Sequence, residues 1–161
     1  MHQLKGFQYA TALDINMWYY TIRISAASQY MTAILTEFDK FRYNCLPMGM
    51  WASGDIFQAK IDKLLGDIEI VKTYIDDILV LGKDSFEKHT AQLINILGRL
   101  HAAGLKVNAP KFSFGLKNIP YVGCVITKEG IKPEPQKVQG IMDLGRPSMT
   151  TEARALIEMV Q

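Results

Sequence analysis

The sequence has 161 residues, of which 48% are apolar and 21% charged, and it lacks low-complexity tracts. These values favour one folded domain with a core, alone or with a fragment of another domain. The net charge of +2 is too small to indicate a nucleic-acid partner by itself. Cys45 and Cys124 have no Cys or His partner at metal-binding spacing, so we expect reduced thiols of an intracellular protein. There is no signal peptide, and no apolar run approaches the roughly 18 residues of a membrane span.

The first apolar stretch predicts a strand that carries a single acid. It runs from Tyr9 to Ile24, and Asp14 lies inside the strand or at its end. A buried carboxylate is unfavourable unless it is paired or binds a cation. The alternative is that Asp14 begins a turn.

The next segment predicts a hairpin, a loop and a helix. Residues 30–43 alternate weakly, which favours a half-exposed hairpin, and residues 46–50 (LPMGM) break this pattern as a loop. Ser53 is a candidate N-cap for a helix with one apolar face that ends near Gly66.

The stretch from Ile68 to Leu81 (IEIVKTYIDDILVL) predicts a second hairpin whose turn is formed by Asp76 and Asp77. Two adjacent acids place like charges together and lack the glycine that tight hairpin turns prefer. Such unfavourable residues in a turn are typical of functional sites, where the side chains are needed for chemistry. A solvated acidic turn is the alternative.

Asp84 and Glu87 have capping-box spacing and begin a predicted helix of about five turns that ends at Gly104. The remaining predicted elements are a strand at 105–108, a hairpin at 120–131 with its turn at 128–130, a helix at 136–144 and a helical tail to 161. This order predicts an α+β fold in which helices pack on one face of an antiparallel sheet.

In such a sheet the strand of Asp14 can lie beside the hairpin of Asp76 and Asp77, which brings three carboxylates to one end. Hard divalent cations, which prefer oxygen ligands, would relieve their repulsion. Two such ions roughly 4 Å apart clamp the attacking and leaving oxygens in phosphoryl transfer. There is no His or Cys cluster to favour zinc.

Five short motifs stand in the order found in reverse transcriptases. They are Leu13-Asp14-Ile15; Leu46-Pro47-Met48-Gly49 with Asp55-Ile56-Phe57-Gln58; Tyr74-Ile75-Asp76-Asp77; Gly104-Leu105-Lys106-Val107-Asn108 with Lys111; and Tyr121-Val122-Gly123. The last two resemble motifs of Gypsy-type LTR retrotransposons. Lys132-Pro133, Lys137-Val138 and Arg146-Pro147 look like that family's entry into the thumb.

The resemblance implies a polymerase palm with partial fingers and the start of the thumb. Residues 1–132 would form the palm, with a lower-fingers hairpin inserted at about 25–50, and residues 133–161 would begin the thumb or connection. The upstream finger residues that bind the triphosphate, most of the thumb and an RNase H domain would belong to the rest of the polyprotein. The implied setting is intracellular, in a cytoplasmic retroelement particle.

The implied reaction is templated DNA synthesis from deoxynucleoside triphosphates on a primed RNA or DNA template. It would use two Mg²⁺ ions, for which Mn²⁺ could substitute. The resemblance implies that Asp14 and Asp76 hold the metals with the Ile15 carbonyl, that Asp77 is a second acid at the metal site, and that Lys111 protonates the pyrophosphate. A solvated surface lysine is the alternative for Lys111.

The other implied site residues fall into two groups. The nucleotide pocket would include Ile15, Trp18, Tyr19, Met48, Gly49 and Gln58, and the primer and template contacts Tyr74, Tyr121, Val122 and Gly123. Tyr19 stands where the family places the aromatic that excludes a 2′-hydroxyl. The alternatives are a core aromatic for Tyr19, an ordinary loop at 48–49 and an exposed helix residue at Gln58.

Two departures from the family bear on activity. Trp18 stands where the family has a small residue, and an indole there would fill the space beside the nucleotide. Gly54 replaces the proline that begins the helix. They leave open a degenerate or truncated copy that folds and binds nucleic acid without catalysis. A third possibility, an RNA-templated RNA polymerase, is disfavoured by Tyr19.

Overall fold

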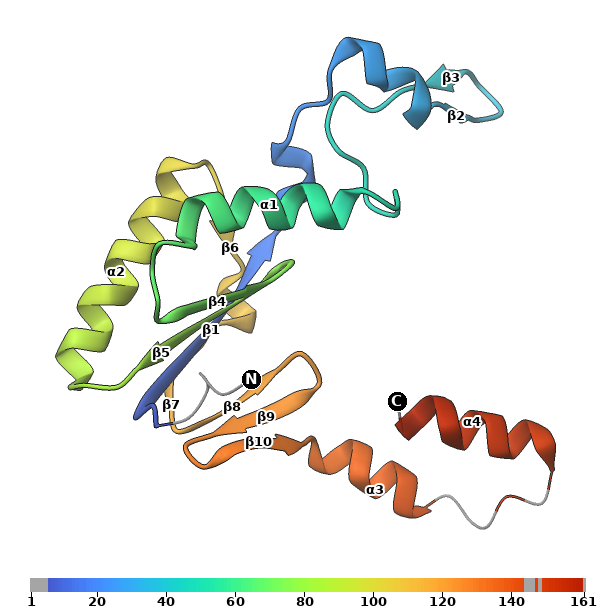
Figure 1. Ribbon diagram of the computed structural model, residues 1–161. Helices are drawn as coiled ribbons and strands as arrows, with labels where there is room; N and C mark the ends of the chain where they lie inside the picture. The colour runs from blue at the N-terminus through green and yellow to red at the C-terminus, as the bar shows by residue number, and fades with distance from the viewer. Residues whose placement is uncertain (1–5, 144–146, 148, 161) are drawn as a thin grey trace.

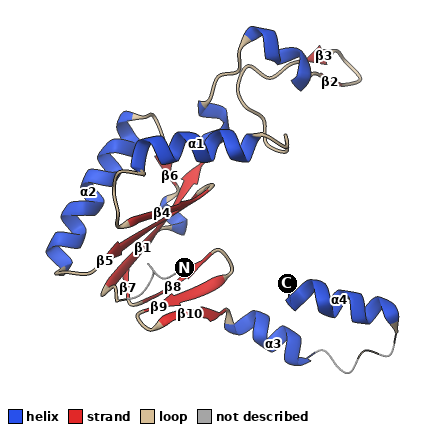
Figure 2. Cartoon of the chain, in the orientation of Figure 1, coloured by secondary structure: helices blue, strands red, loops and turns tan. Residues whose placement is uncertain are grey.

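The computed structural model describes residues 6–143, 147 and 149–160. The helices are α1 (Ser53–Leu65), α2 (Phe86–Ala102), α3 (Pro135–Asp143) and α4 (Thr150–Val160), with 3₁₀ turns η2 (Trp18–Thr21), η3 (Ala26–Thr32) and η4 (Ala109–Lys111) (Figures 1 and 2). The strands are β1 (Tyr9–Asn16), β2 (Ile34–Leu35), β3 (Lys40–Phe41), β4 (Val71–Tyr74), β5 (Asp77–Gly82), β6 (Lys106–Val107), β7 (Ser113–Leu116), β8 (Asn118–Tyr121), β9 (Cys124–Thr127) and β10 (Gly130–Pro133). The predicted α+β class is confirmed.

Strand β1 is the centre of the main sheet. It pairs antiparallel with β5, which pairs in turn with β4, while β6 and β7 pair with β1 as well. The β1–β5 register runs from Tyr9 opposite Gly82 to Asp14 opposite Asp77. This register decides which acids meet.

The two faces of the sheet are covered differently. Helices α1 and α2 pack on one face, as predicted, and the three-stranded sheet β8–β10 packs on the other (Figure 1). Strand β5 shows the alternation, because Ile78 and Val80 join the helical core while Leu79 and Leu81 join the core beneath β8 and β9. A strand buried on both faces reads as a continuous apolar run.

Several local predictions were wrong in detail. The turn between β4 and β5 is Ile75-Asp76, and Asp77 already pairs with Tyr74 as the first residue of β5. Val122-Gly123 is also a turn, so residues 120–127 form two strands where one was predicted. Gly123 suits this position because its φ of +71° is in the left-handed region.

The two predicted N-caps were wrong too, whereas Gly66 is the C-cap of α1 as predicted. Ser53 is the first residue of α1, and its hydroxyl donates to the carbonyl of Pro47. At α2 the N-cap is Ser85, whose hydroxyl accepts the amide of Lys88, while Asp84 forms an ion pair with Lys88. A serine one residue later gave the better capping geometry.

Other predicted elements are present, although two of them are shorter than predicted. The strand that carries Asp14 is shorter than predicted, because η2 follows it. The hairpin at 30–43 is reduced to β2 and β3, which are exposed. Helix α3 matches the predicted helix, although Leu144 and Arg146 lie outside the described residues.

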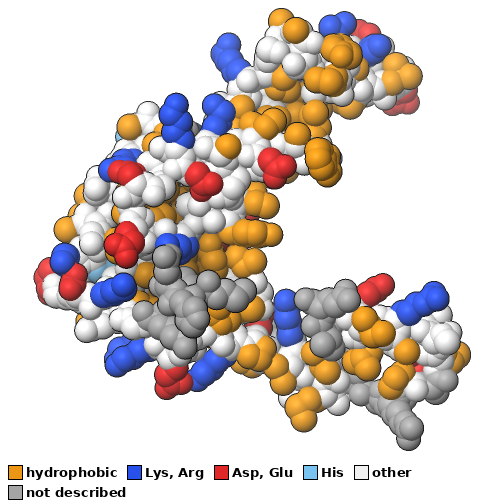
Figure 3. Space-filling model, viewed as in Figure 1, with side chains coloured by type: hydrophobic (Ala, Val, Ile, Leu, Met, Phe, Trp, Pro, Cys, Tyr) orange, Lys and Arg blue, Asp and Glu red, His pale blue; other side chains and the backbone are white. Residues whose placement is uncertain are grey.

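The chain has a concave side (Figures 1 and 3). The segment with β2 and β3 projects beyond one end of the main sheet, and α3 projects from β10 at the other. The tip of the β4–β5 hairpin points toward the hollow between them. None of the described helices is long and apolar enough to cross a membrane.

Candidate active site

Asp14 and Asp77 lie opposite each other on neighbouring strands. Both point away from the helical face, because Asp14 alternates with Leu13 and Ile15 and Asp77 alternates with Ile78. Directly opposed residues place their Cβ atoms about 4.5–5.5 Å apart. Two carboxylates therefore share one end of the sheet, as predicted.

Asp76 joins them through the backbone. The amide of Ile15 donates to the carbonyl of Asp76 at 3.1 Å, which fixes the β4–β5 turn against the end of β1. The side chain of Asp76 is exposed at the tip of the hairpin.

The electrostatics of this cluster reflect mutual repulsion. Burial raises the pKa of the Asp77 carboxyl, and the negative charges of Asp76 and Asp14 raise it further, while Lys111 acts in the opposite direction. Burial and the charge of Asp76 also raise the pKa of the Tyr19 hydroxyl. The charges of Asp14 and Asp76 therefore both act on Asp77, and that of Asp76 acts on Tyr19 as well.

Backbone strain concentrates beside the predicted site residues. Within the described ranges, the non-glycine residues with positive φ are Met17 (48°), Ile75 (51°) and Val122 (47°). A β-branched residue in the left-handed region is an outlier that costs about 1–2 kcal/mol. Val122 forms the β8–β9 turn and is itself a predicted primer contact, while Met17 directly precedes Trp18 and Ile75 lies between Tyr74 and Asp76.

Among the described residues, the side chain of Asp14 has two polar partners, and both come from the segment that follows β6. The side-chain amide of Asn108 donates to Oδ2 at 2.9 Å, and Nζ of Lys111 lies 3.4 Å from Oδ1. The side chain of Lys111 is 66% exposed and that of Asp14 only 15%. Lys111 is therefore an exposed cation at the edge of the cluster.

Gln58 is half-buried and turned toward the acidic hairpin. Its Oε1 accepts the amide of Ile75 at 2.7 Å, and its Nε2 donates to Asp62 at 2.8 Å and Thr73 at 3.0 Å. Thr73 donates in turn to Asp62 at 2.9 Å. Gln58 was expected to face the nucleotide or to be an exposed helix residue. Its side chain instead holds the turn before Asp76.

The indole of Trp18 does not fill the space beside the acids. It is 2% exposed and stacks against Tyr19 and Phe57 in the helical core. Tyr19 is half-buried beside it and senses Asp76, in keeping with a place at the edge of the pocket. The expectation that Trp18 obstructs the nucleotide is wrong in this arrangement, because residue 18 points into the core.

The predicted primer and template residues differ in their accessibility. Tyr74, Val122 and Gly123 are exposed. The hydroxyl of Tyr121 instead donates to the carbonyls of Lys72 and Asp77, both at 3.4 Å, and burial raises its pKa. Tyr121 therefore joins the small sheet to the acidic hairpin.

Met48 and Gly49 lie in an exposed loop that leads into α1. The Ser53 hydroxyl anchors this loop through the Pro47 carbonyl at 2.8 Å. The start of α1 lies against the acidic hairpin, since a Cβ on Gly54 would be 3.9 Å from Cδ1 of Ile75. The loop is thereby tied to the helix end nearest the acids.

The acids suit magnesium by charge and donor type. Among the described residues, no group of three or more His, Cys, Asp or Glu side chains is placed so that it could by itself hold a metal ion. Mg²⁺ does not require one, because it keeps several waters and takes one or two carboxylates together with substrate phosphates. Asp14, Asp76 and Asp77, whose repulsion is evident at Asp77, are the residues that could hold it.

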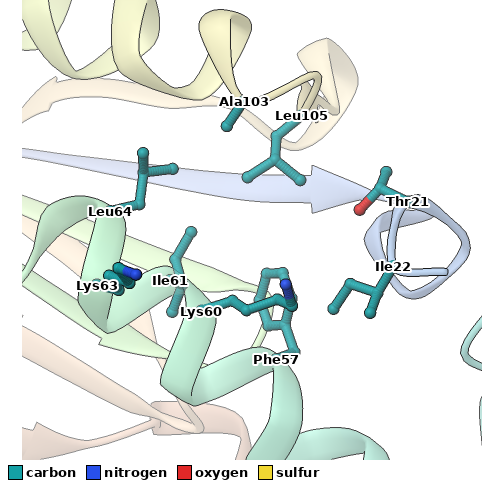
Figure 4. A pocket seen from close by; sticks show the side chains of 9 residues that line it. All are labelled: Thr21, Ile22, Phe57, Lys60, Ile61, Lys63, Leu64, Ala103 and Leu105. Carbon is teal, nitrogen blue, oxygen red and sulfur yellow. The ribbon is translucent and has the colours of Figure 1, made fainter. Parts of the chain in front are cut away.

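A cavity elsewhere holds no catalytic group. Its volume is about 420 Å³, and it lies between α1, η2 and the segment after α2 (Figure 4). The lining side chains are Thr21, Ile22, Phe57, Lys60, Ile61, Lys63, Leu64, Ala103 and Leu105. The cavity lining contains no acid and none of the predicted site residues, so the acidic hairpin remains the candidate site.

Two contacts were missed by sequence reasoning. Asn108 was noted as part of a motif but given no role, and Thr73 was regarded only as a strand residue. Their partners are Asp14 and the Gln58–Asp62 pair. An asparagine three residues before a candidate catalytic lysine was the available signal for Asn108.

Comparisons with known proteins identify the family of this chain. The family model described as reverse transcriptase (RNA-dependent DNA polymerase) matches residues 1–126. The chain is 30% identical over 158 residues to the retrovirus-related Pol polyprotein from transposon opus of Drosophila melanogaster, covering 97% of this chain and 16% of that protein. It is 24% identical to the Pol polyprotein from transposon gypsy of the same species, covering 93% and 15%. The chain thus spans about a sixth of the length of these relatives.

Solved structures show the same fold. The foamy viral protease-reverse transcriptase in complex with RNA/DNA hybrid matches with a TM-score of 0.86 at 22% identity, covering 98% of this chain and 22% of that one. The same protein in complex with dsDNA matches with a TM-score of 0.87 at 22% identity, covering 98% and 34%. With the family model matching most of its length, the chain belongs to the reverse transcriptase (RNA-dependent DNA polymerase) family.

Proposed function

We propose that this chain is the catalytic palm of a retroelement polymerase that extends a DNA primer on an RNA template. The observation that carries the proposal is the meeting of Asp14, Asp76 and Asp77 at one end of the main sheet. The relatives are Pol polyproteins, and a solved structure of similar fold holds an RNA/DNA hybrid, which supports a primed template as partner. Deoxynucleoside triphosphates are the proposed substrates.

The reaction is a nucleotidyl transfer in which the primer 3′-oxygen bonds to the α-phosphorus and pyrophosphate leaves. Magnesium, with Mn²⁺ as a possible substitute, would supply positive charge to the attacking and leaving oxygens. In our proposal Asp14 and Asp76 hold the two ions with the Ile15 carbonyl, and Asp77 sets the local charge. Lys111 is exposed and swings to give a proton to the departing pyrophosphate.

Other residues orient the substrates. Tyr19, beside Asp76, would exclude a 2′-hydroxyl, and the exposed loop of Met48 and Gly49 would border the incoming nucleotide. Tyr74 and the Val122-Gly123 turn would contact the primer end. The palm limit at residue 132 and the intracellular location stay predictions.

The competing reading is a degenerate copy that folds and binds nucleic acid without catalysis. Trp18 and Gly54 are among the departures that motivate it. The indole of Trp18 is buried in the core, which supports the proposal of a competent palm.

Primer extension tests the proposal. This chain is joined to the fingers and thumb of a related reverse transcriptase and assayed with Mg²⁺ on a primed RNA template. We expect extension by the unaltered sequence, none with Asp76→Asn, less with Asp77→Asn, and normal extension with the remote control Asp84→Asn. Persistent extension with Asp76→Asn would refute the metal assignment. Extension that appears only after Trp18→Gly would support the degenerate copy, and equal use of ribonucleotides would contradict the role of Tyr19.

A further inference from the structure

Asn108 is attached to Asp14 at two points. Its backbone amide donates to the Asp14 carbonyl at 2.8 Å, and its side-chain amide donates to Oδ2 of the same residue at 2.9 Å. The pairing of Ile15 with Val107 and of Asn16 with Lys106 continues this attachment along β1 and β6. Residues 94 positions apart in the sequence are thereby held as one unit.

The ordinary structural role of such an asparagine is not filled here. Asn108 stands at the N-cap of η4, but its side chain makes no capping hydrogen bond. The turn is closed instead by the amide of Lys111, which donates to the Asn108 carbonyl at 3.1 Å. The side-chain amide of Asn108 is therefore directed to the carboxylate and not to its own turn.

The turn at 108–111 thus presents two donors of different charge to the two oxygens of one carboxylate. Asn108 is neutral and half-buried, and it takes Oδ2. Lys111 is cationic and exposed, and it approaches Oδ1 at 3.4 Å. A divalent cation at Asp14 repels the ammonium of Lys111 but not the amide of Asn108.

We propose that Asn108 is a positioning residue that fixes the orientation of the Asp14 carboxylate before and after a divalent ion binds, while Lys111 occupies Oδ1 only until the ion arrives. This inference rests on the proposed function, because it assumes that Asp14 is a metal ligand. An amide hydrogen bond to one carboxylate oxygen orients the other toward the ion, as outer partners of metal ligands commonly do. The release of Lys111 would also free its ammonium for the pyrophosphate.

Binding of Mn²⁺ to this chain, followed by electron paramagnetic resonance, tests the proposal without any enzymatic assay. We expect Asn108→Ala to weaken Mn²⁺ binding about tenfold. Lys111→Met should act in the opposite direction and tighten binding about two- to fivefold, because it removes a competing cation. The matched control Asn118→Ala, at the exposed start of β8, should leave binding unchanged.

Each outcome decides a separate claim. If the unaltered chain binds no Mn²⁺, the metal site of the proposed function fails and the role of Asn108 fails with it. If the unaltered chain and Asn108→Ala bind Mn²⁺ equally, or Lys111→Met also weakens binding, only the positioning role is overturned.

A measurement on the unaltered chain guards against a variant that does not fold. We expect the side-chain amide proton that Asn108 donates to Oδ2 of Asp14, observed by NMR, to stay protected from solvent exchange both without and with Mg²⁺. Mg²⁺ that exposes this proton to exchange would overturn the proposal.

Discussion

Replacing Gln58 by leucine keeps a side chain of similar volume but removes the acceptor of the Ile75 amide and the donor to Asp62 and Thr73. The bond to Ile75 is the important one, because that residue holds a φ of 51° immediately before Asp76. Without its acceptor, the turn has less to offset the strained backbone. We therefore expect the turn to open more often.

The size of the effect follows from two contributions. An amide left without a partner costs about 1–3 kcal/mol when buried, and the left-handed conformation of Ile75 costs about 1–2 kcal/mol. The turn is only partly buried, so water replaces some of the lost bonding. We expect the free energy of unfolding to fall by about 1–2 kcal/mol, and the exchange protection of the Ile75 amide to fall about tenfold or more.

Urea denaturation and amide hydrogen exchange by NMR measure these two quantities. The control is Gln139→Leu on α3, because Gln139 donates to Asp143 four residues later just as Gln58 donates to Asp62, but no backbone amide bonds to it among the described contacts. Gln139→Leu should change neither the Ile75 exchange nor the stability by more than a few tenths of a kcal/mol. An unchanged Ile75 exchange rate in Gln58→Leu would refute the reasoning.

Three further predictions concern stability and can be measured by urea denaturation. His89 is 1% exposed and burial lowers its pKa, so the unfolded chain binds the proton more readily than the folded chain does. Stability is therefore full above about pH 6.5 and declines as the pH falls toward the folded pKa. His89→Gln should lessen this decline, whereas the control His101→Gln, at an exposed position, should not. Gly82→Ala should destabilise the protein by about 1–3 kcal/mol, because its Cβ would lie 2.5 Å from Nδ1 of the buried His89 ring. Gly98→Ala, with open space in α2, should stabilise the protein by up to about 1 kcal/mol. A change in stability of the same sign for both variants would contradict this reasoning. Trp18→Ala should destabilise by about 3–5 kcal/mol since the indole lies in the core, and an unchanged midpoint would show that the indole is not packed there.

The acidic hairpin shows how far local sequence carries a structural prediction. The apolar, β-branched runs on either side of Asp76-Asp77 were sufficient to predict two strands, because pattern and propensity act over a few residues. These runs did not show which residues form the turn. The strand register decides this by pairing Tyr74 with Asp77. The strained backbone of Ile75 is stabilised by Gln58 of α1, which accepts a hydrogen bond from its amide.

Trp18 shows the same division at a candidate site residue. Its position beside Tyr19 suggested a side chain in the nucleotide pocket, because the resemblance fixes order along the chain and not direction. The 3₁₀ turn that follows the left-handed Met17 rotates the indole onto Phe57 of α1 instead. The direction of a side chain after a strand end depends on such backbone details.

By itself the sequence determined the α+β class, the order of the motifs and the acids Asp14, Asp76 and Asp77, because these are properties of residue type and spacing. The tertiary structure alone decided that Asp14 faces Asp77, that Ile15 binds Asp76 through the backbone, and that Asn108 holds the carboxylate of Asp14. These contacts join residues that are far apart in the chain, and only the packing of β1 against β5 and β6 fixes which of them meet.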